Sequence, residues 1–429
     1  MKRPASTPHV QRSLPGTDDV LRRTLSNGIT VLARPNFNSP SVSISGYVVA
    51  GNLLDTDERL GLADFAASML MRGTERRTFD QVFGALEEVG ASLGYDSGAH
   101  STTFGGRSLS EDLPLLLEVL SETLRMPTFP ADEVEKLRAQ LLTGLAIRAQ
   151  DTGDMASLTF DKILFDGHPY SRPGDGNPET VQAITRADLT DFHGRFIGPN
   201  GMVLAIVGGV QPQEAIEQVE RTLGNWAVSD QAAVPELPPY QALAATTRRN
   251  HAIAGKSQSD IILGTAGPRR KDPEFMATSL GNSILGQFGM MGRIGDVVRE
   301  KSGLAYYAHS SLSAGLGPGS WEVSAGVNPA NVEKTIDLIL VELRRFVGDG
   351  VTAEELADSQ SNFIGRLPLS LESNAGVAGA LANIERFDLG LDYYRTYADL
   401  VRSVRVDDIL TAASKYIDPE RLAIAVAGP

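Results

Sequence analysis

The stretch IGPNGMVLAIVGG at residues 197–209 returns later in the chain in a related form, IDPERLAIAVAGP at residues 417–429. The offset between the two is 220 residues (417 − 197), and in both a proline turn precedes an apolar run typical of a buried strand. A second pair, ADEV at 131–134 and AEEL at 353–356, is offset by 222 residues. Self-similarity at so long a period indicates two homologous halves of roughly 210 residues each.

Local patterns predict the elements within these halves. Asn27-Gly28 between apolar residues predicts a hairpin turn before a strand at 29–33, and alternation along 42–48 predicts a strand with one buried face. Between Gly61 and Gly73 the apolar residues recur at helical spacing. Further helices are expected at about 79–91, 111–125, 131–150 and 186–196. Because strands and helices mix without strict βαβ alternation, each half is predicted to be an α+β domain, a mostly antiparallel mixed sheet covered by helices.

The division of the chain follows from composition. Residues 1–20 are expected to form a flexible N-terminal arm, and residues 21–228 the N-terminal α+β domain. Residues 229–246 contain the Pro- and Ala-rich run VPELPPYQALAA and are expected to be a linker. Residues 247–429 are expected to form the C-terminal α+β domain.

The composition excludes several classes of function. The 429 residues contain 39 Lys and Arg against 53 Asp and Glu, a net charge of −14, and no dense basic run, which argues against nucleic acid as a partner. The absence of Cys excludes disulfides, Fe–S clusters, thiolate zinc sites and a cysteine nucleophile. No run of about 18 apolar residues and no apolar leader is present, so no membrane segment is expected and the expected location is the cytoplasm.

Five segments in this order resemble the pitrilysin/insulinase superfamily of inverted-motif zinc peptidases, which includes the mitochondrial processing peptidase. The resemblance covers about 20–429. The segments are LSNG at 25–28, GLA at 61–63 with MRGT at 71–74, GHPY at 167–170 with Arg172-Pro173, the repeated stretch at 197–209, and VREKSGLAY at 298–306. The resemblance implies two homologous domains that form half of a clamshell around a peptide chamber.

The catalytic motif of that family is degenerate in this sequence. The family carries H-x-x-E-H on its first long helix, where two His bind zinc and the Glu polarises a bound water. Asp64 and Ser68 stand where the His ligands would be, and Ala67 stands where the base would be. The third ligand, a Glu in the family, would fall near Gly144. The resemblance therefore implies no catalytic residue and no metal in this chain, with zinc expected in a partner subunit.

The second half keeps the residues by which this family holds a peptide. Arg299 and Tyr306 have the family's spacing of seven (306 − 299), and the resemblance implies that they bind the substrate and help polarise the scissile carbonyl. The alternative is a surface charge at Arg299 and a core-packing Tyr306. Gly286, Gly289 and Gly292 resemble the family's glycine-rich substrate loop, although the inserted side chains could serve either peptide contact or ordinary packing. The inserted residues are Phe288, Met290 and Met291.

These features favour a non-catalytic subunit of a heteromeric zinc metallopeptidase. The chain would not be catalytic alone, and would contribute Arg299 and Tyr306 to the zinc site of a homologous partner that carries H-x-x-E-H. The alternative is a structural scaffold subunit of a larger complex with no role in proteolysis. The acidic net charge would also favour the approach of basic peptides.

Overall fold

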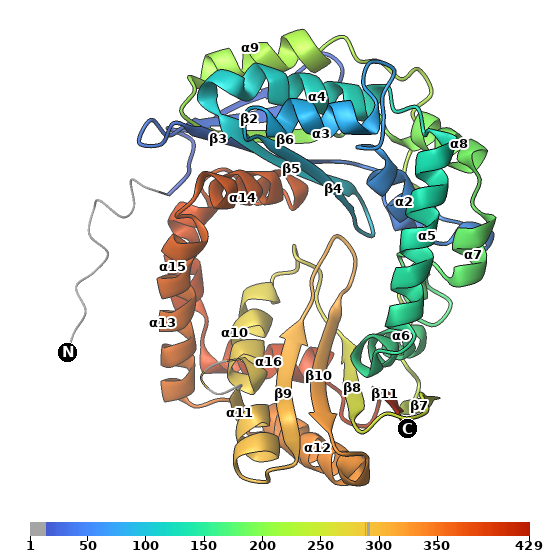
Figure 1. Cartoon of the computed structure of the whole chain (residues 1–429). Helices are drawn as coiled ribbons and strands as arrows, with labels where there is room; N and C mark the ends of the chain where they lie inside the picture. Colours follow the sequence, from blue (N-terminus) through green and yellow to red (C-terminus); the bar gives the residue numbers. More distant parts are fainter. Residues whose placement is uncertain (1–13, 288, 290–291) are drawn as a thin grey trace. The chain divides into compact units, whose positions relative to one another are not determined.

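The computed structural model describes residues 14–287, 289 and 292–429 (Figure 1). Contacts divide the chain into two compact units. The described residues of the first unit are 14–144, Pro173–Glu236 and Leu367–Thr396. The second comprises Leu145–Arg172, Leu237–Arg366 and Tyr397–Pro429.

The first unit is built on a six-stranded mixed sheet. Its order is β1 (Leu21–Thr24), β2 (Thr30–Pro35), β6 (Val203–Gly208), β3 (Ser41–Val48), β5 (Thr102–Leu109) and β4 (Ser92–Ser97). Only the β2–β6 pair among these is parallel. The predicted hairpin joins β1 to β2, and Gly28 adopts the positive φ of +92° that its turn requires. The sequence prediction of this hairpin is confirmed.

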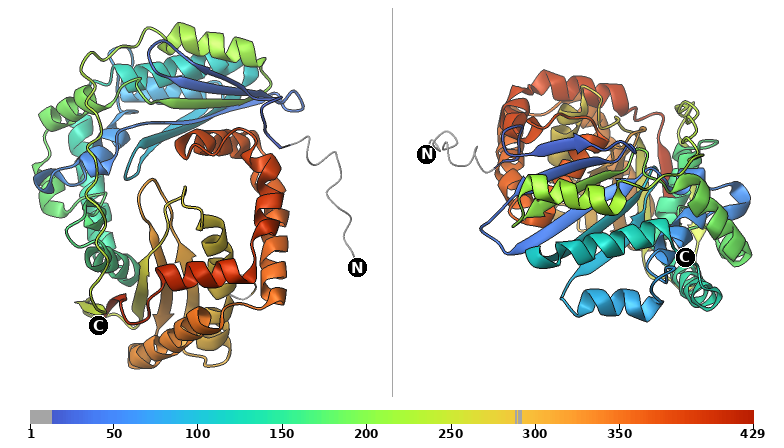
Figure 2. Two further views of the ribbon diagram at one scale, coloured as in Figure 1. Left: turned by 180° about the vertical axis from the view of Figure 1, so that it is seen from behind. Right: turned by 90° about the horizontal axis from the view of Figure 1, so that it is seen from above.

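Helices cover both faces of the first sheet. Figures 1 and 2 show α3, α4 and α9 over one face and α14 against the other. Buried side chains of α14 at Val377, Leu381 and Ile384 pack on Val203 and Val207 of β6, because their helical spacing places them on one stripe. The helices of this unit are α2 (Leu62–Met69), α3 (Phe79–Glu87), α4 (Leu113–Arg125), α5 (Ala131–Arg148), α7 (Pro178–Ala183), α8 (Arg186–Phe196), α9 (Pro212–Leu223) and α14 (Asn374–Arg386). Short 3-10 turns lie at Asn52–Leu54, Asp57–Arg59 and Ser110–Asp112.

The second unit repeats this plan with a five-stranded mixed sheet. Its order is β7 (Thr247–Ala252), β11 (Ala423–Gly428), β8 (Ser259–Ala266), β10 (Ser320–Val327) and β9 (Ala305–Leu312). The repeated sequence stretches end in β6 and β11, and each of these strands lies between one parallel and one antiparallel neighbour. The predicted α+β class with two homologous sheets is therefore confirmed.

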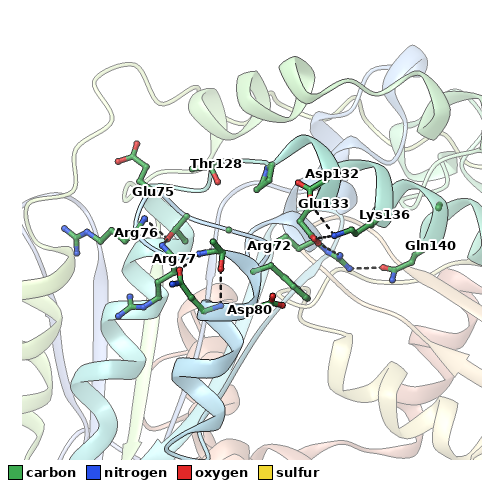
Figure 3. A pocket seen from close by; sticks show the side chains of 17 residues that line it. Arg72, Glu75, Arg76, Arg77, Asp80, Thr128, Asp132, Glu133, Lys136 and Gln140 are labelled. Carbon is green, nitrogen blue, oxygen red and sulfur yellow. Dashed lines mark hydrogen bonds and ion pairs between the residues drawn. The ribbon is translucent and has the colours of Figure 1, made fainter.

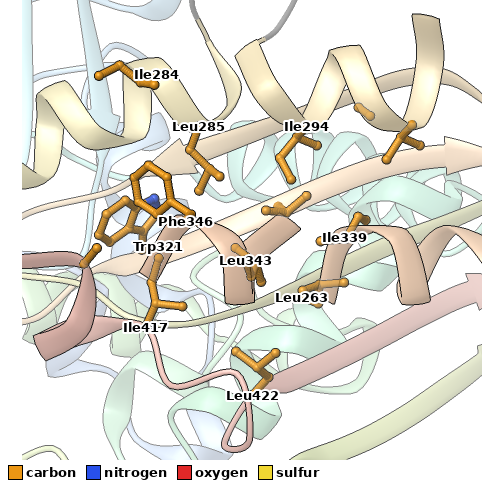
Figure 4. Close-up of a cluster of buried hydrophobic side chains, with 14 of the residues drawn as sticks. Leu263, Ile284, Leu285, Ile294, Trp321, Ile339, Leu343, Phe346, Ile417 and Leu422 are labelled. Carbon is orange, nitrogen blue, oxygen red and sulfur yellow. The ribbon is translucent and has the colours of Figure 1, made fainter. Parts of the chain in front are cut away.

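The core of the second unit lies between its sheet and the helices α10, α12 and α16 (Figure 4). Trp321 of β10 meets Phe346 of α12 edge-on at 6.0 Å between ring centroids, and its indole N–H donates to Asn282 Oδ1 at 3.0 Å. The helices are α6 (Thr152–Leu164), α10 (Phe275–Gly286), α11 (Gly292–Gly295), α12 (Val332–Asp349), α13 (Ala353–Ser370), α15 (Tyr393–Ser403) and α16 (Val406–Tyr416), with a π-helical turn at Asp296–Glu300 and 3-10 turns at Pro169–Ser171 and Pro329–Asn331.

One helix of each sequence half packs on the sheet formed by the other half. α6 begins at Thr152 and packs on β11 and β8, whereas α14 begins at Asn374 and packs on β3 and β6. Their starting residues differ by 222 (374 − 152), the offset of the sequence repeat, so the two helices occupy equivalent repeat positions. Among the described residues, no helix is both long enough and apolar enough to cross a membrane.

Candidate functional site

The helix α2 carries Asp64, Ala67 and Ser68, the positions predicted from the sequence to replace the zinc motif, and the loop before it fixes where that helix begins. Asp55 accepts hydrogen bonds from the backbone N–H groups of Gly61 (2.9 Å) and Ala63 (3.0 Å). Gly61 adopts a positive φ of +89°, so the chain can turn directly into α2. Burial raises the pKa of Asp55 to about 7. The expected helix 61–73 is shorter in the structure, because α2 ends at Met69.

The two polar positions of α2 lie one helical turn apart. Asp64 and Ser68 are both partly exposed, whereas Ala67 is buried in the core. Burial, together with the nearby carboxylates of Asp175 and Asp96, raises the pKa of Asp64 to about 6. Burial is the largest of these causes. A carboxylate and a hydroxyl at this spacing offer zinc neither of the nitrogen or sulfur ligands it prefers.

Gly144, the position predicted to replace the third ligand, lies on α5. Gly144 is exposed, and apart from the adjoining residues and backbone of its own helix no described heavy atom lies within 4 Å of the place that a Cβ would occupy. In the ranges that the structure describes, no three His, Asp or Glu side chains are grouped to hold a metal ion. The residues present at Asp64, Ala67, Ser68 and Gly144 therefore do not fit a zinc centre of the kind that the family carries.

Arg299 lies in the π-helical turn Asp296–Glu300 of the second unit. Its side chain is 37% exposed, and its Nε lies 3.7 Å from Glu300 Oε1, an ion pair too long to be a hydrogen bond. The backbone is held firmly, because Val298 is buried and accepts from the Leu304 N–H at 3.1 Å. Such π-helical turns are frequent at functional sites.

Tyr306 lies on β9, one of the two edge strands of the second sheet. Ala305 pairs with Val327 and Tyr307 pairs with Gly326, so Tyr306 is the extra residue of a β-bulge. The Tyr306 side chain is 87% exposed, whereas the hydroxyl of Tyr307 donates to the buried Asp260 at 2.5 Å. The bulge thus turns Tyr306 to solvent, whereas Tyr307 is partly buried.

The glycines before Arg299 have different physical roles. A Cβ on Gly286 would lie 2.1 Å from the backbone nitrogen of Ser310, so α10 and β9 approach too closely for any side chain. Gly292 has a positive φ of +63°, and its Cβ would lie 2.6 Å from Ile284 O. Gly289 also has a positive φ but faces open space. The inserted residues of this loop, Phe288, Met290 and Met291, lie outside the described residues.

The structure thus distributes the predicted residues over the two units. The positions Asp64, Ala67 and Ser68 belong to the first unit. Arg299, Tyr306 and the three loop glycines belong to the second. In the described part of the chain, no hydrogen bond joins Arg299 to Tyr306.

The first unit also contains a groove of about 920 Å³ that the sequence reasoning missed (Figure 3). Arg72 bridges Glu133 (3.0 Å) and Gln140 (2.8 Å) across it, and Lys136 contacts Glu133 at 2.6 Å. Because these charges satisfy one another, the groove offers little uncompensated charge to a ligand. The run RGTERR at 72–77 is the sequence signal that could have indicated it.

The two mixed sheets, each packed with helices, define the two-domain fold of M16 peptidases. Residues 30–162 match the family described as insulinase (peptidase family M16), and residues 183–363 match the peptidase M16 inactive domain. The chain belongs to the M16 peptidase family, also called the insulinase or pitrilysin family. The resemblance recognised in the sequence is confirmed at this level.

Two relatives and one solved structure illustrate the proteins to which this chain is similar. An uncharacterized zinc protease of Streptomyces coelicolor is 28% identical over 423 residues, 96% of this chain and 90% of that protein. The mouse mitochondrial cytochrome b-c1 complex subunit 1 is 25% identical over 268 residues, 62% of this chain and 55% of that subunit. A Pseudomonas fluorescens structure described as a peptidase M16 inactive domain has a TM-score of 0.89 at 26% identity, and the match covers 96% of this chain and 98% of that one.

Proposed function

We propose that this chain is a non-catalytic, peptide-binding subunit of a heteromeric zinc metallopeptidase. A homologous partner that carries H-x-x-E-H would bind the zinc ion and activate the water. This chain would supply Arg299 and Tyr306 to the bound peptide. The observation that carries the proposal is the contrast between α2, whose side chains cannot form a zinc site, and the exposed Arg299 and Tyr306.

The first part of the argument is chemical. A peptidase zinc site needs three protein ligands and a nearby base that takes a proton from the bound water. Ala67, at the position of the base, has no titratable group and is packed in the core. Asp64 and Ser68 supply one carboxylate and one hydroxyl. Hydrolysis by this chain alone would therefore need another set of groups, and none is indicated among the described side chains.

The second part concerns what Arg299 and Tyr306 can do. A guanidinium remains protonated and can donate two parallel hydrogen bonds to a carbonyl or carboxylate. A tyrosine hydroxyl can donate to an oxygen that gains negative charge in the transition state. The bulge at Tyr306 and the partial exposure of Arg299 leave both groups free to meet a ligand. Neither group is needed to stabilise the core.

The names of the relatives support both this proposal and one alternative. Proteins similar along nearly the whole chain are named zinc proteases, which favours a role in proteolysis. The similarity to cytochrome b-c1 complex subunit 1 favours a scaffold subunit as the second candidate. The two candidates differ in whether Arg299 affects peptide turnover.

Replacement of Arg299 by Ala tests the proposal in the complex reconstituted with its H-x-x-E-H partner. The loss of one hydrogen-bonding charge is expected to lower kcat/KM about 10- to 100-fold while assembly stays intact. Tyr306→Phe removes only a hydroxyl and is expected to lower kcat/KM with no loss of thermal stability. Arg402→Ala is the matched control, because Arg402 is an exposed arginine whose one ion-pair partner among the described residues is Asp399 on its own helix. Unchanged turnover in the Arg299 variant would favour the scaffold alternative.

A further inference from the structure

Arg386 is a half-buried arginine in the first unit, and no Asp or Glu among the described residues forms an ion pair with it. It is the last residue of α14, and its guanidinium carbon lies 5.3 Å from the centroid of the Tyr47 ring. One nitrogen, Nη2, donates to the hydroxyl of Ser101, a residue that is only 2% exposed. Within the described ranges, no ion pair and no further hydrogen bond involves this side chain.

A partly buried charge without a counter-charge is costly, so its surroundings need an explanation. Burial lowers the pKa of Arg386, yet an arginine stays protonated at any physiological pH. Arg293 shows the usual solution, because its guanidinium forms two bonds of 2.7 Å with the carboxylate of Glu355. Glu385, which adjoins Arg386, is occupied by two hydrogen bonds from Arg22.

Tyr47 provides a second donor at the same place. Burial raises its pKa to about 12, so its hydroxyl keeps the proton at physiological pH. In the part of the chain that the structure describes, this hydroxyl makes no hydrogen bond. Among the residues that the structure describes, the guanidinium of Arg386 and the hydroxyl of Tyr47 are therefore two donors whose one acceptor is Ser101. A carboxylate, which accepts from a guanidinium through both oxygens, matches this set.

The surface beside Arg386 can admit an extended chain. Tyr47 of β3 pairs with Thr103 of β5, which pairs with Asp96 of the edge strand β4, so these three residues form one row across the sheet. Thr103 is partly exposed and Asp96 is exposed, so the face beyond Arg386 is open. Strands lie about 5 Å apart, so the outer edge of β4 is on the order of 10 Å from Tyr47. A peptide that continues from this edge strand across the exposed face over Thr103 would pass within reach of the Arg386 side chain.

We propose that Arg386, Tyr47 and Ser101 form a binding subsite for a peptide carboxylate. Arg386 donates to the carboxylate, Tyr47 adds a hydrogen bond, and Ser101 fixes the orientation of the guanidinium. The carboxylate comes either from the C-terminus of the peptide or from an Asp or Glu side chain. This subsite rests on the peptide-binding function proposed above, and it adds the chemical class of ligand group that the first unit selects.

Peptide binding to the purified full-length chain tests this proposal. Three ten-residue peptides of Ala, Ser and Thr, each labelled at the N-terminus with an uncharged BODIPY dye, are compared by fluorescence anisotropy. One has a free C-terminal carboxylate, one a C-terminal amide, and one an amide with Glu as its last residue. At least one carboxylate-bearing peptide is expected to bind about 10-fold more tightly than the neutral amide, and the preferred peptide identifies the source of the carboxylate.

Variants separate binding from a purely structural role. Arg386→Gln keeps a polar side chain but removes the charge, and is expected to abolish the preference for a carboxylate. Tyr47→Phe keeps the ring beneath the guanidinium and is expected to weaken the preference about threefold. Arg386→Lys retains the charge and is expected to restore part of it. The matched control is Arg195→Gln on α8, an exposed arginine paired with Asp191, which is expected to leave binding unchanged.

The outcomes distinguish this inference from the function on which it rests. If all three peptides bind equally, or if folded Arg386→Gln keeps the preference, the subsite is refuted and peptide binding stands. If none of the three binds at millimolar concentration, both the subsite and the proposed peptide-binding function are refuted. Thermal unfolding of each variant shows whether it is folded, and Tyr47→Phe provides the test if Arg386→Gln is not.

Discussion

At the scale of single residues, the effect of a buried carboxyl group on the stability of the fold depends on the groups that surround it. Asp55 and Asp161 both have a pKa raised to about 7 by burial. Asp55 accepts backbone hydrogen bonds, among them those from Gly61 and Ala63, that hold the start of α2. Asp161 on α6 instead lies near another carboxylate, Glu322 of β10, and this like charge is the second cause of its raised pKa. Replacement of the two residues is therefore expected to change stability in opposite directions.

Asp161→Asn is expected to stabilise the protein at alkaline pH. The folded-state pKa of about 7 lies above the unfolded value of about 3.9, so the folded state binds the proton more tightly. The free energy of unfolding contributed by this group is therefore highest below about pH 4 and falls as the pH rises to about 7. The variant should gain on the order of 2 kcal/mol at pH 8 and less at pH 5.5. Urea unfolding at both pH values measures this gain, and a gain that does not grow with pH would contradict the assignment.

Asp55→Asn is expected to destabilise the protein at pH 8. An amide can accept through one oxygen only, so one of the N–H groups of Gly61 and Ala63 would face an NH₂ group. The loss should be about 1–2 kcal/mol, typical of a lost helix-start hydrogen bond. Urea unfolding beside the Asp161→Asn protein provides the comparison. An equal gain in both variants would show that the backbone contacts of Asp55 contribute nothing.

At the scale of elements, the close approach of α10 to β9 fixes the backbone that leads to Arg299. Gly286→Ala would place a Cβ 2.1 Å from the Ser310 nitrogen and is expected to cost about 3 kcal/mol or more. Gly365→Ala on α13 is the control, because that Cβ would face open space and should stabilise by about 0.5–1 kcal/mol. Thermal unfolding measures both. Equal stability of the Gly286 variant and the wild type would show that the contact can relax.

The elements also show what the sequence could predict. The turn at Asn27-Gly28 and the helix 186–196 were predictable from local signals, and α8 spans Arg186–Phe196 as expected. The sequence could not predict that α6 packs on the second sheet and α14 on the first. The apolar stripe of an amphipathic helix shows that the helix packs on something, but not on which sheet. The contact between Arg386 and Tyr47 could not be predicted either, because 339 residues (386 − 47) separate the two in the sequence. In the sequence alone, Arg386 is typical of the basic residues found in the last turn of a helix. The spacing from Arg299 singled out Tyr306 in the sequence. The exposure of its side chain depends on a β-bulge, which only the strand register shows.

At the scale of the whole molecule, the exchanged helices predict that neither sequence half is stable alone. A fragment of residues 1–236 lacks α14, so the apolar face of Leu32, Val203 and Val207 would be uncovered. This fragment is expected to aggregate or to bind a hydrophobic dye, and a peptide of residues 367–396 is expected to reduce both effects. Dye fluorescence with and without that peptide provides the measurement. A fragment that unfolds cooperatively without the peptide would contradict the expectation.

The division of labour between this chain and a catalytic partner is the central claim, and zinc stoichiometry tests it most directly. The chain is purified alone, dialysed extensively, and analysed for zinc beside the complex with its H-x-x-E-H partner. The account predicts a value near zero for the chain alone and near one zinc per heterodimer. A value near one for the chain alone would mean that a ligand set other than Asp64, Ala67, Ser68 and Gly144 exists, and would contradict the claim that this subunit is non-catalytic.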